Sequence, residues 1–108
     1  MIGALRHRIT FQESVRVPDG GGGFTETWQN IAAAPEVYAA LQPLSGSEQQ
    51  RFYQLETTVT HRIIVRGRED ITPALRIVRG AEVYDIISVT AREEAGSYLE
   101  ILAVVRRP

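Results

Sequence analysis

The side chains that most often do chemistry are few in this sequence and poorly placed to act together. His61 continues the alternating apolar row of Val59 and Ile63, a position typical of a core or interface histidine rather than a general base. His7 lies between two arginines near the N-terminus, where we expect it to be exposed to solvent. The acidic pairs at 69–70 and 93–94 cannot converge on one substrate from a strand, because neighbouring strand residues face opposite ways. We expect these acids to be solvated turn residues.

The residue types that are missing exclude several mechanisms. The chain has no cysteine, which excludes disulfides, thiolate metal sites and a cysteine nucleophile. It also has no lysine, which excludes a Walker A phosphate loop and a Schiff-base mechanism. No serine has the sharp, glycine-flanked setting of a hydrolase nucleophile. The sequence therefore predicts a protein that is not an enzyme and that uses no cofactor and no metal.

The formal charge of the chain is close to neutral, and lysine is absent from its basic residues. All 12 basic residues are arginines, and 13 acidic residues bring the formal net charge to −1. The chain therefore has no overall basic field to attract nucleic acid. Two explanations of the arginine usage stay open, namely bidentate pairing with carboxylates at protein interfaces and a coding bias toward arginine codons.

The elements that must position these residues are mostly strands. The 108 residues suit a single domain, 1–108, in which apolar and polar residues alternate with a period of two. Tight turns are expected at 79–82, where Gly80 suits the first central position of a type II′ turn, and at 94–97. These features predict a mainly β fold, a small antiparallel barrel or sandwich of about six strands with one short helix. The expected strands are 8–13, 37–44, 58–66, 75–79, 83–89 and 98–105.

No segment indicates a membrane or a secretion route. The chain contains no run of about 18 apolar residues, the length that a membrane-spanning helix needs. The first eight residues have no apolar signal-peptide core. We therefore expect no membrane partner and synthesis in the cytoplasm.

A glycine-rich segment interrupts the strand pattern between residues 17 and 24. Four consecutive glycines lose a large backbone entropy on ordering and hold one conformation only with outside contacts. The segment is also longer than a two-residue hairpin turn. We predict a flexible, projecting loop that contacts a partner through Asp19, Gly20, Gly21, Gly22, Gly23 and Phe24.

A second interruption, at 45–55, has the features of a helix. Ser45 with Glu48, and Ser47 with Gln50, both have the spacing of a capping box, in which a hydroxyl and an acid or amide satisfy the first free amides of a helix. Phe52 and Leu55 can share one helix face and are expected to hold this short helix against the barrel wall.

The order of these features resembles the phage head–tail joining proteins, also called head-closure or stopper proteins, which occur in siphophages, prophages and gene transfer agents. The resemblance spans nearly the whole chain, and rests on the order and spacing of several stretches rather than on one motif. These stretches are LRHRITFQ (5–12), GGGFTETW (21–28), VYAALQPLSGSE (37–48), TVTHRIIVR (58–66), LRIVRGAEVYDI (75–86) and YLEI (98–101).

The resemblance implies a structural component of a tailed-phage or gene-transfer-agent particle. Such a protein forms a ring in the neck, with the adaptor and portal ring above it and tail components below. The ring continues the channel for double-stranded DNA, touching it without sequence specificity, and helps to retain it. The segment between the second and third family strands projects into this channel as a gate. Here the gate segment comprises Gln42, Ser45, Ser47, Glu48, Gln49, Gln50, Arg51, Phe52, Tyr53, Gln54 and Leu55.

Assembly is expected to depend on the partner. A small domain with polar loops should be a monomer in dilute solution and should form its ring only on the particle, assembled in the bacterial cytoplasm. Arg62, Arg66 and Arg76, on outer strand faces, are candidates for contacts between subunits. Two alternatives stay open: a tail-completion or tail-terminator protein, and a free-standing nucleic-acid-binding barrel. A further alternative for the helix is that it plugs one end of the barrel.

Overall fold

The chain folds into antiparallel strands and one helix, as its alternation predicts. The computed structural model describes residues 5–93 and 97–106. Seven strands are present where about six were expected, because residues 24–30 form a strand that we had not predicted. The elements are β1 (His7–Pro18), β2 (Phe24–Asn30), β3 (Glu36–Pro43), α1 (Gly46–Gln54), β4 (His61–Arg66), β5 (Arg76–Arg79), β6 (Glu82–Arg92) and β7 (Tyr98–Arg106).

The strands form one sheet that closes on itself. Its order is β2-β1-β3-β4-β7-β6-β5, and an additional pairing of β1 with β5 joins the far strand back to β1. Six strands, β1, β3, β4, β7, β6 and β5, therefore make a closed ring, which we call the barrel. Closure leaves few unpaired strand edges, the usual solution for small all-β proteins.

The core lies inside the barrel and follows the period of two. In β7, Leu99, Ile101, Ala103 and Val105 are buried and alternate with half-buried residues. Ile9 and Phe11 of β1 reach the same core, and both are almost fully buried. Burying a Val, Leu, Ile or Phe side chain stabilises the fold by about 1.5–3 kcal/mol, so these residues contribute to the stability of the barrel.

A β-bulge in β6 keeps its apolar residues on the inner face. The pairing with β7 shifts between Ile86 and Ser88, which leaves Ile87 partly exposed. Because a bulge adds one residue, it reverses the alternation that follows. Val89 therefore packs against the core instead of facing solvent.

The turn between β5 and β6 confirms the expected hairpin. Arg79 pairs with Glu82, and Gly80 has a φ of +58°, as the first central position of a type II′ turn requires. The other expected turn, at 94–97, includes residues 94–96, which lie outside the described residues.

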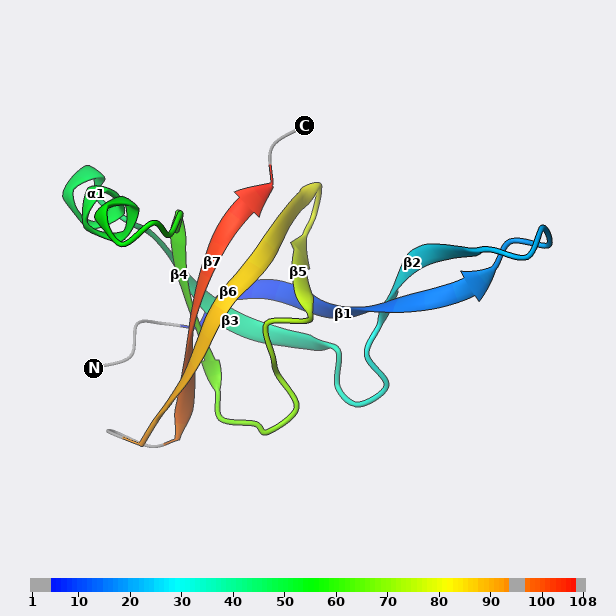
Figure 1. Ribbon diagram of the computed structural model, residues 1–108. Helices are drawn as coiled ribbons and strands as arrows, with labels where there is room; N and C mark the ends of the chain where they lie inside the picture. The colour runs from blue at the N-terminus through cyan, green and yellow to red at the C-terminus, as the bar shows by residue number, and fades with distance from the viewer. Residues whose placement is uncertain (1–4, 94–96, 107–108) are drawn as a thin grey trace.

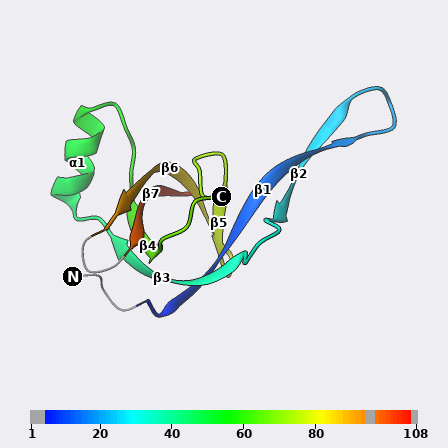
Figure 2. The same ribbon diagram turned by 90° about the horizontal axis from the view of Figure 1, so that it is seen from below.

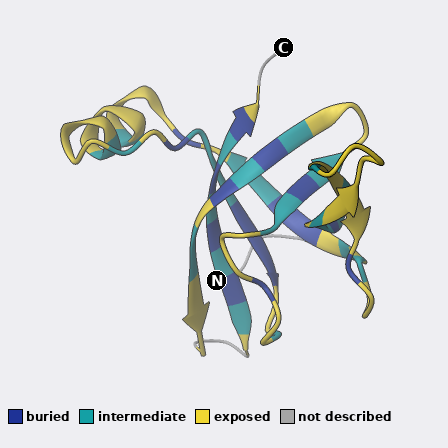
Figure 3. Cartoon of the chain, turned by 45° about the vertical axis from the view of Figure 1, so that its right-hand side comes forward, coloured by how far each residue is buried: buried dark blue, intermediate teal, exposed yellow. Residues whose placement is uncertain are grey.

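Two segments project from the barrel in opposite directions. The outer half of β1, residues 12–18, pairs with β2 and forms a two-stranded arm that we call the ribbon, and it extends away from the barrel (Figure 1). Helix α1 lies at the other end of the molecule, as the view from below also shows (Figure 2). Most residues of both projections are exposed, whereas the barrel strands alternate between buried and half-buried (Figure 3). The long axis of the molecule measures 51 Å, against 32 and 23 Å for the other two.

Candidate functional site

Helix α1 stands off the barrel instead of packing on it. None of its residues is buried, and Tyr53 and Leu55 are 74% and 69% exposed. The expectation that Phe52 and Leu55 hold the helix against the barrel wall is therefore wrong: Phe52 is only half-buried and Leu55 faces solvent. A helix with no buried side chain cannot plug a barrel end either. The gate segment is a projection that the barrel core does not require.

The start of the helix follows the first of the two predicted capping boxes. The Ser45 hydroxyl accepts a hydrogen bond from the Glu48 backbone N–H (3.3 Å) and donates one to the Glu48 carboxylate (3.3 Å). The second expected box fails because Ser47 already lies inside the helix, which begins at Gly46. The cap satisfies one of the free amides of the first turn, which a nine-residue helix without packing needs.

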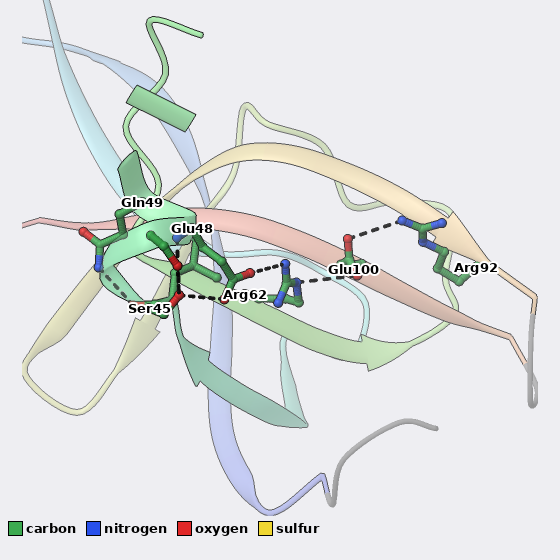
Figure 4. Close-up of polar contacts among 8 residues, drawn as sticks. Ser45, Glu48, Gln49, Arg62, Arg92 and Glu100 are labelled. Carbon is green, nitrogen blue, oxygen red and sulfur yellow. Dashed lines mark hydrogen bonds and ion pairs between the residues drawn. The ribbon is translucent and has the colours of Figure 1, made fainter. Parts of the chain in front are cut away.

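A chain of charged groups ties the helix to the barrel (Figure 4). Arg62 of β4 contacts Glu48 of the helix at 3.2 Å and Glu100 of β7 at 3.7 Å. Arg92 of β6 contacts the other oxygen of Glu100 at 3.5 Å. The hydrogen bond from Arg62, with a smaller effect from Ser45, lowers the pKa of Glu48 below its usual value.

The helix has one further anchor. The Gln49 side-chain amide donates a hydrogen bond to the backbone oxygen of Leu44 (3.1 Å). Leu44 is buried, so this bond fixes the first turn of the helix to a rigid part of the chain. Among the described residues, no side chain from Gln50 to Leu55 makes a hydrogen bond or an ion pair.

The glycine-rich loop is the tip of the ribbon, and Asp19 organises it. The Asp19 carboxylate accepts hydrogen bonds from the backbone N–H groups of Gly21 (2.8 Å) and Gly23 (3.1 Å). The Asp19 N–H in turn donates to the Gly23 carbonyl (3.1 Å). The prediction of a projecting segment is confirmed, but the tip is a five-residue hairpin loop with its own hydrogen bonds. The loop starts later than expected because β1 continues to Pro18.

One face of the ribbon carries aromatic rings covered by arginines. The Arg16 guanidinium lies over the Phe24 ring at 4.5 Å, and that of Arg76 lies over the Trp28 ring at 4.5 Å. Arg76 also donates a hydrogen bond to the Gln12 side chain (2.9 Å). Since Arg76 belongs to β5, these contacts fix the base of the ribbon to the barrel.

The three arginines proposed for contacts between subunits have different surroundings. Arg62 is occupied by Glu48 and Glu100, and Arg76 by Gln12 and Trp28. Arg66 is exposed and makes no hydrogen bond or ion pair with another side chain among the described residues.

Sequence reasoning missed Arg68, which joins two connecting loops. Its guanidinium donates hydrogen bonds to the backbone oxygens of Ala33 (2.7 Å) and Ala34 (2.8 Å), and contacts both carboxylate oxygens of Asp70. The hydrogen bond from Arg68 lowers the pKa of Asp70. Asp70, expected to be a solvated turn residue, therefore holds Arg68 in place. Arg68 and Asp70, two residues apart, were a signal in the sequence, but the carbonyls that Arg68 reaches are more than thirty residues away.

His61 lies where the alternation predicted, at the edge of the core. It is half-buried, and its ring meets that of Tyr84 edge to face, with centroids 5.1 Å apart. The Thr60 hydroxyl lies 2.8 Å from its Nδ1 atom.

The described residues contain no group of three or more side chains suited to holding a metal ion. Within the same part of the chain, no helix is long and apolar enough to cross a membrane. Of the cavities, one of about 610 Å³ opens beside β3 and the end of β4.

Comparisons with known proteins agree with this architecture. Residues 1–106 match the phage head completion protein family, and the chain belongs to this family of phage structural proteins. A chain of the virion of a native gene transfer agent (GTA) particle is 27% identical, with a TM-score of 0.60 and 93% of each chain covered.

A second solved structure is more similar in shape. Protein SF1141 from Shigella flexneri 2a is 31% identical, with a TM-score of 0.72, over 94% of this chain and 93% of that one. No curated protein matches the chain. The resemblance to phage head–tail joining proteins is thus confirmed at the level of the family.

Proposed function

We propose that this protein is a ring-forming connector in the neck of a tailed-phage or gene-transfer-agent particle. The ring would continue the DNA channel below the portal and adaptor, above the tail components, and would help to retain packaged DNA. The protein would be structural, without catalysis. Family membership and the similarity to a chain of a GTA particle support a place in the virion.

The observation that carries the proposal is the unburied helix. The connection between two paired strands, β3 and β4, contains helix α1, residues 46–54, which stands away from the barrel and has no buried residue (Figure 1). Such a segment adds little to the core, so its use lies outside the fold. Its polar residues Glu48, Gln49, Arg51 and Gln54 suit a water-filled channel, and mixed charge avoids the strong phosphate binding that would slow DNA exit.

The alternatives are less well supported. A free-standing nucleic-acid-binding barrel needs exposed aromatic rings for base stacking. The exposed rings here, Phe24, Tyr38 and Tyr53, lie on three different elements, β2, β3 and α1, rather than along one strand face. Arginines also lie over two of them, Arg16 over Phe24 and Arg8 over Tyr38. A tail-completion protein would bind the tail tube rather than the adaptor.

The test is to replace residues 47–54 with a short Gly-Ser turn. We expect the barrel to keep its melting temperature within a few degrees, since no buried residue is removed. Particles carrying the variant should fill with DNA and then lose it, as measured by nuclease-protected DNA per particle. The control is Thr90→Ser, at an exposed residue of β6 outside the gate segment, and it should retain DNA. If particles of the shortened variant hold DNA normally, the gate segment does not retain DNA and this role is refuted.

A further inference from the structure

The 610 Å³ cavity is a groove with an apolar floor and charged residues at its rim. Val37 and Val65 line it, together with Leu5 and Ala34. Tyr38, 56% exposed, and Arg66 also line it. The volume is within the range of cavities that take whole ligands, about 300–1,000 Å³, and is ample for one aromatic side chain.

Within the described part of the chain, the Arg66 charge at this rim has no ion-pair partner. Arg66 makes no hydrogen bond or ion pair with another side chain among the described residues, whereas Arg68 beside it is held by Asp70. A guanidinium of this kind is suited to a carboxylate from outside. The groove therefore fits a segment that carries a large apolar side chain next to an acid.

The ribbon carries this combination on one face. Phe24 and Glu26 are two residues apart in β2, so their side chains lie on the same face. Phe24 is 57% exposed although Arg16 lies over its ring, and Glu26, which stands opposite Arg16 in the ladder, makes no ion pair among the described residues. A two-stranded ribbon with both faces in water is marginally stable alone, so docking would stabilise it.

The ribbon of one molecule cannot occupy its own groove. The groove is lined by residues 34, 37 and 38, from the β2–β3 connection and the start of β3. The ribbon runs outward from the barrel in both views, with its tip far from the barrel (Figures 1 and 2). The nearest groove that its tip can enter belongs to a second copy.

We propose that the ribbon of one copy docks in the groove of the next, with Phe24 against the apolar floor and Glu26 facing Arg66. The contact joins two different surfaces, so it is head-to-tail and generates a ring when its rotation closes. This contact would join neighbouring subunits of the proposed ring, and the inference rests on the proposed function. Each contact is small, and the ring gains its stability from repeating it around a template.

Cysteine cross-linking tests this contact, because the chain has no cysteine of its own. The variant combines Pro18→Cys, on the ribbon face that holds Phe24, with Ala34→Cys in the groove. It leaves Phe24, Glu26 and Arg66 in place. The control combines Ala34→Cys with Thr25→Cys, since Thr25 pairs with Val17 and lies on the opposite ribbon face.

Oxidation of assembled particles should give a ladder of disulfide-linked multimers for the variant and monomers for the control. Dimers alone would indicate a self-complementary contact. A cross-link to another neck protein would identify a different occupant, and monomers alone would mean an empty groove. Each of these three results would overturn the proposal.

A charge exchange gives a second, independent measurement. Glu26→Arg and Arg66→Glu alone should each lower the yield of DNA-filled particles by about tenfold, because the like charges repeat around the ring. The double variant should recover most of this yield. No recovery from a folded double variant would refute the contact. If the protein is in the neck but its double-cysteine variant forms no ladder, only the contact is wrong; if the protein is absent from the neck, the proposed function itself fails.

Discussion

At the scale of residues, arginines join parts of the chain that are distant in sequence. Arg62 ties α1 to two strands, Arg76 fixes the base of the ribbon, and Arg68 joins two loops. The sequence places Arg62 and Arg76 on outer strand faces but cannot tell which partner each one meets. That depends on strand order, which brings Glu100 of β7 beside Arg62 of β4.

Arg68→Ala tests whether the loop contact stabilises the fold. The substitution removes two bonds to backbone carbonyls and leaves Asp70 without its partner, so we expect the free energy of unfolding to fall by about 2 kcal/mol. Arg66→Ala is the matched control, because the Arg66 side chain has no partner among the described residues, and it should change stability by less than about 0.5 kcal/mol. Equal effects in urea unfolding would contradict this account.

The same contact predicts a dependence of stability on pH. The pKa of Asp70 is lowered in the folded protein, chiefly by the hydrogen bond from Arg68, so the stabilising effect is complete above the ordinary aspartate value of 3.8. This stabilising effect is lost as the pH falls from that value through the lower pKa that Asp70 has in the folded protein. Asp70 is partly exposed, which keeps the effect small. Asp70→Asn should therefore reduce the loss of stability between pH 5 and pH 2, measured by unfolding in urea at each pH.

At the scale of elements, alternation predicted the barrel strands better than the projections. The expected strands 75–79, 83–89 and 98–105 coincide with β5, β6 and β7 to within a few residues, because a buried face imposes a strict period of two. Residues 24–30 were missed because the ribbon has solvent on both faces and shows no apolar row. The helix was predicted from its cap, but its distance from the barrel was not. Half-buried Phe52 and exposed Leu55 have the same spacing that residues of a packed helix would have.

The ribbon tip allows a comparison between neighbouring glycines. Gly22 has a φ of +88°, a region that costs other residues about 1–2 kcal/mol, whereas Gly21 has no positive φ. We expect Gly22→Ala to break the hydrogen bonds to Asp19 at the tip, and Gly21→Ala to keep them. Amide hydrogen exchange at residues 21 and 23 measures this. Unchanged exchange in Gly22→Ala would mean that the Asp19 carboxylate, rather than the glycine, fixes the loop.

At the scale of the whole molecule, a closed barrel carries two projections at opposite ends. The resemblance found in the sequence gave the family, which the match over residues 1–106 confirms. The position of the helix and ribbon on opposite sides could not be predicted, because it follows from the twist of the closed sheet and from Arg76 and Arg68 at the base of the ribbon. This separation suits a ring, in which one projection reaches a neighbour and the other the channel.

The most direct test of the proposed function is a cryo-electron microscopy map of particles that contain this protein, compared with particles that lack it. The account predicts extra density that forms a ring between the adaptor and the tail, with α1 on the channel side and the ribbon toward the adjacent copy. Density in the capsid or along the tail tube, or a ring with α1 on its outer surface, would contradict the proposal.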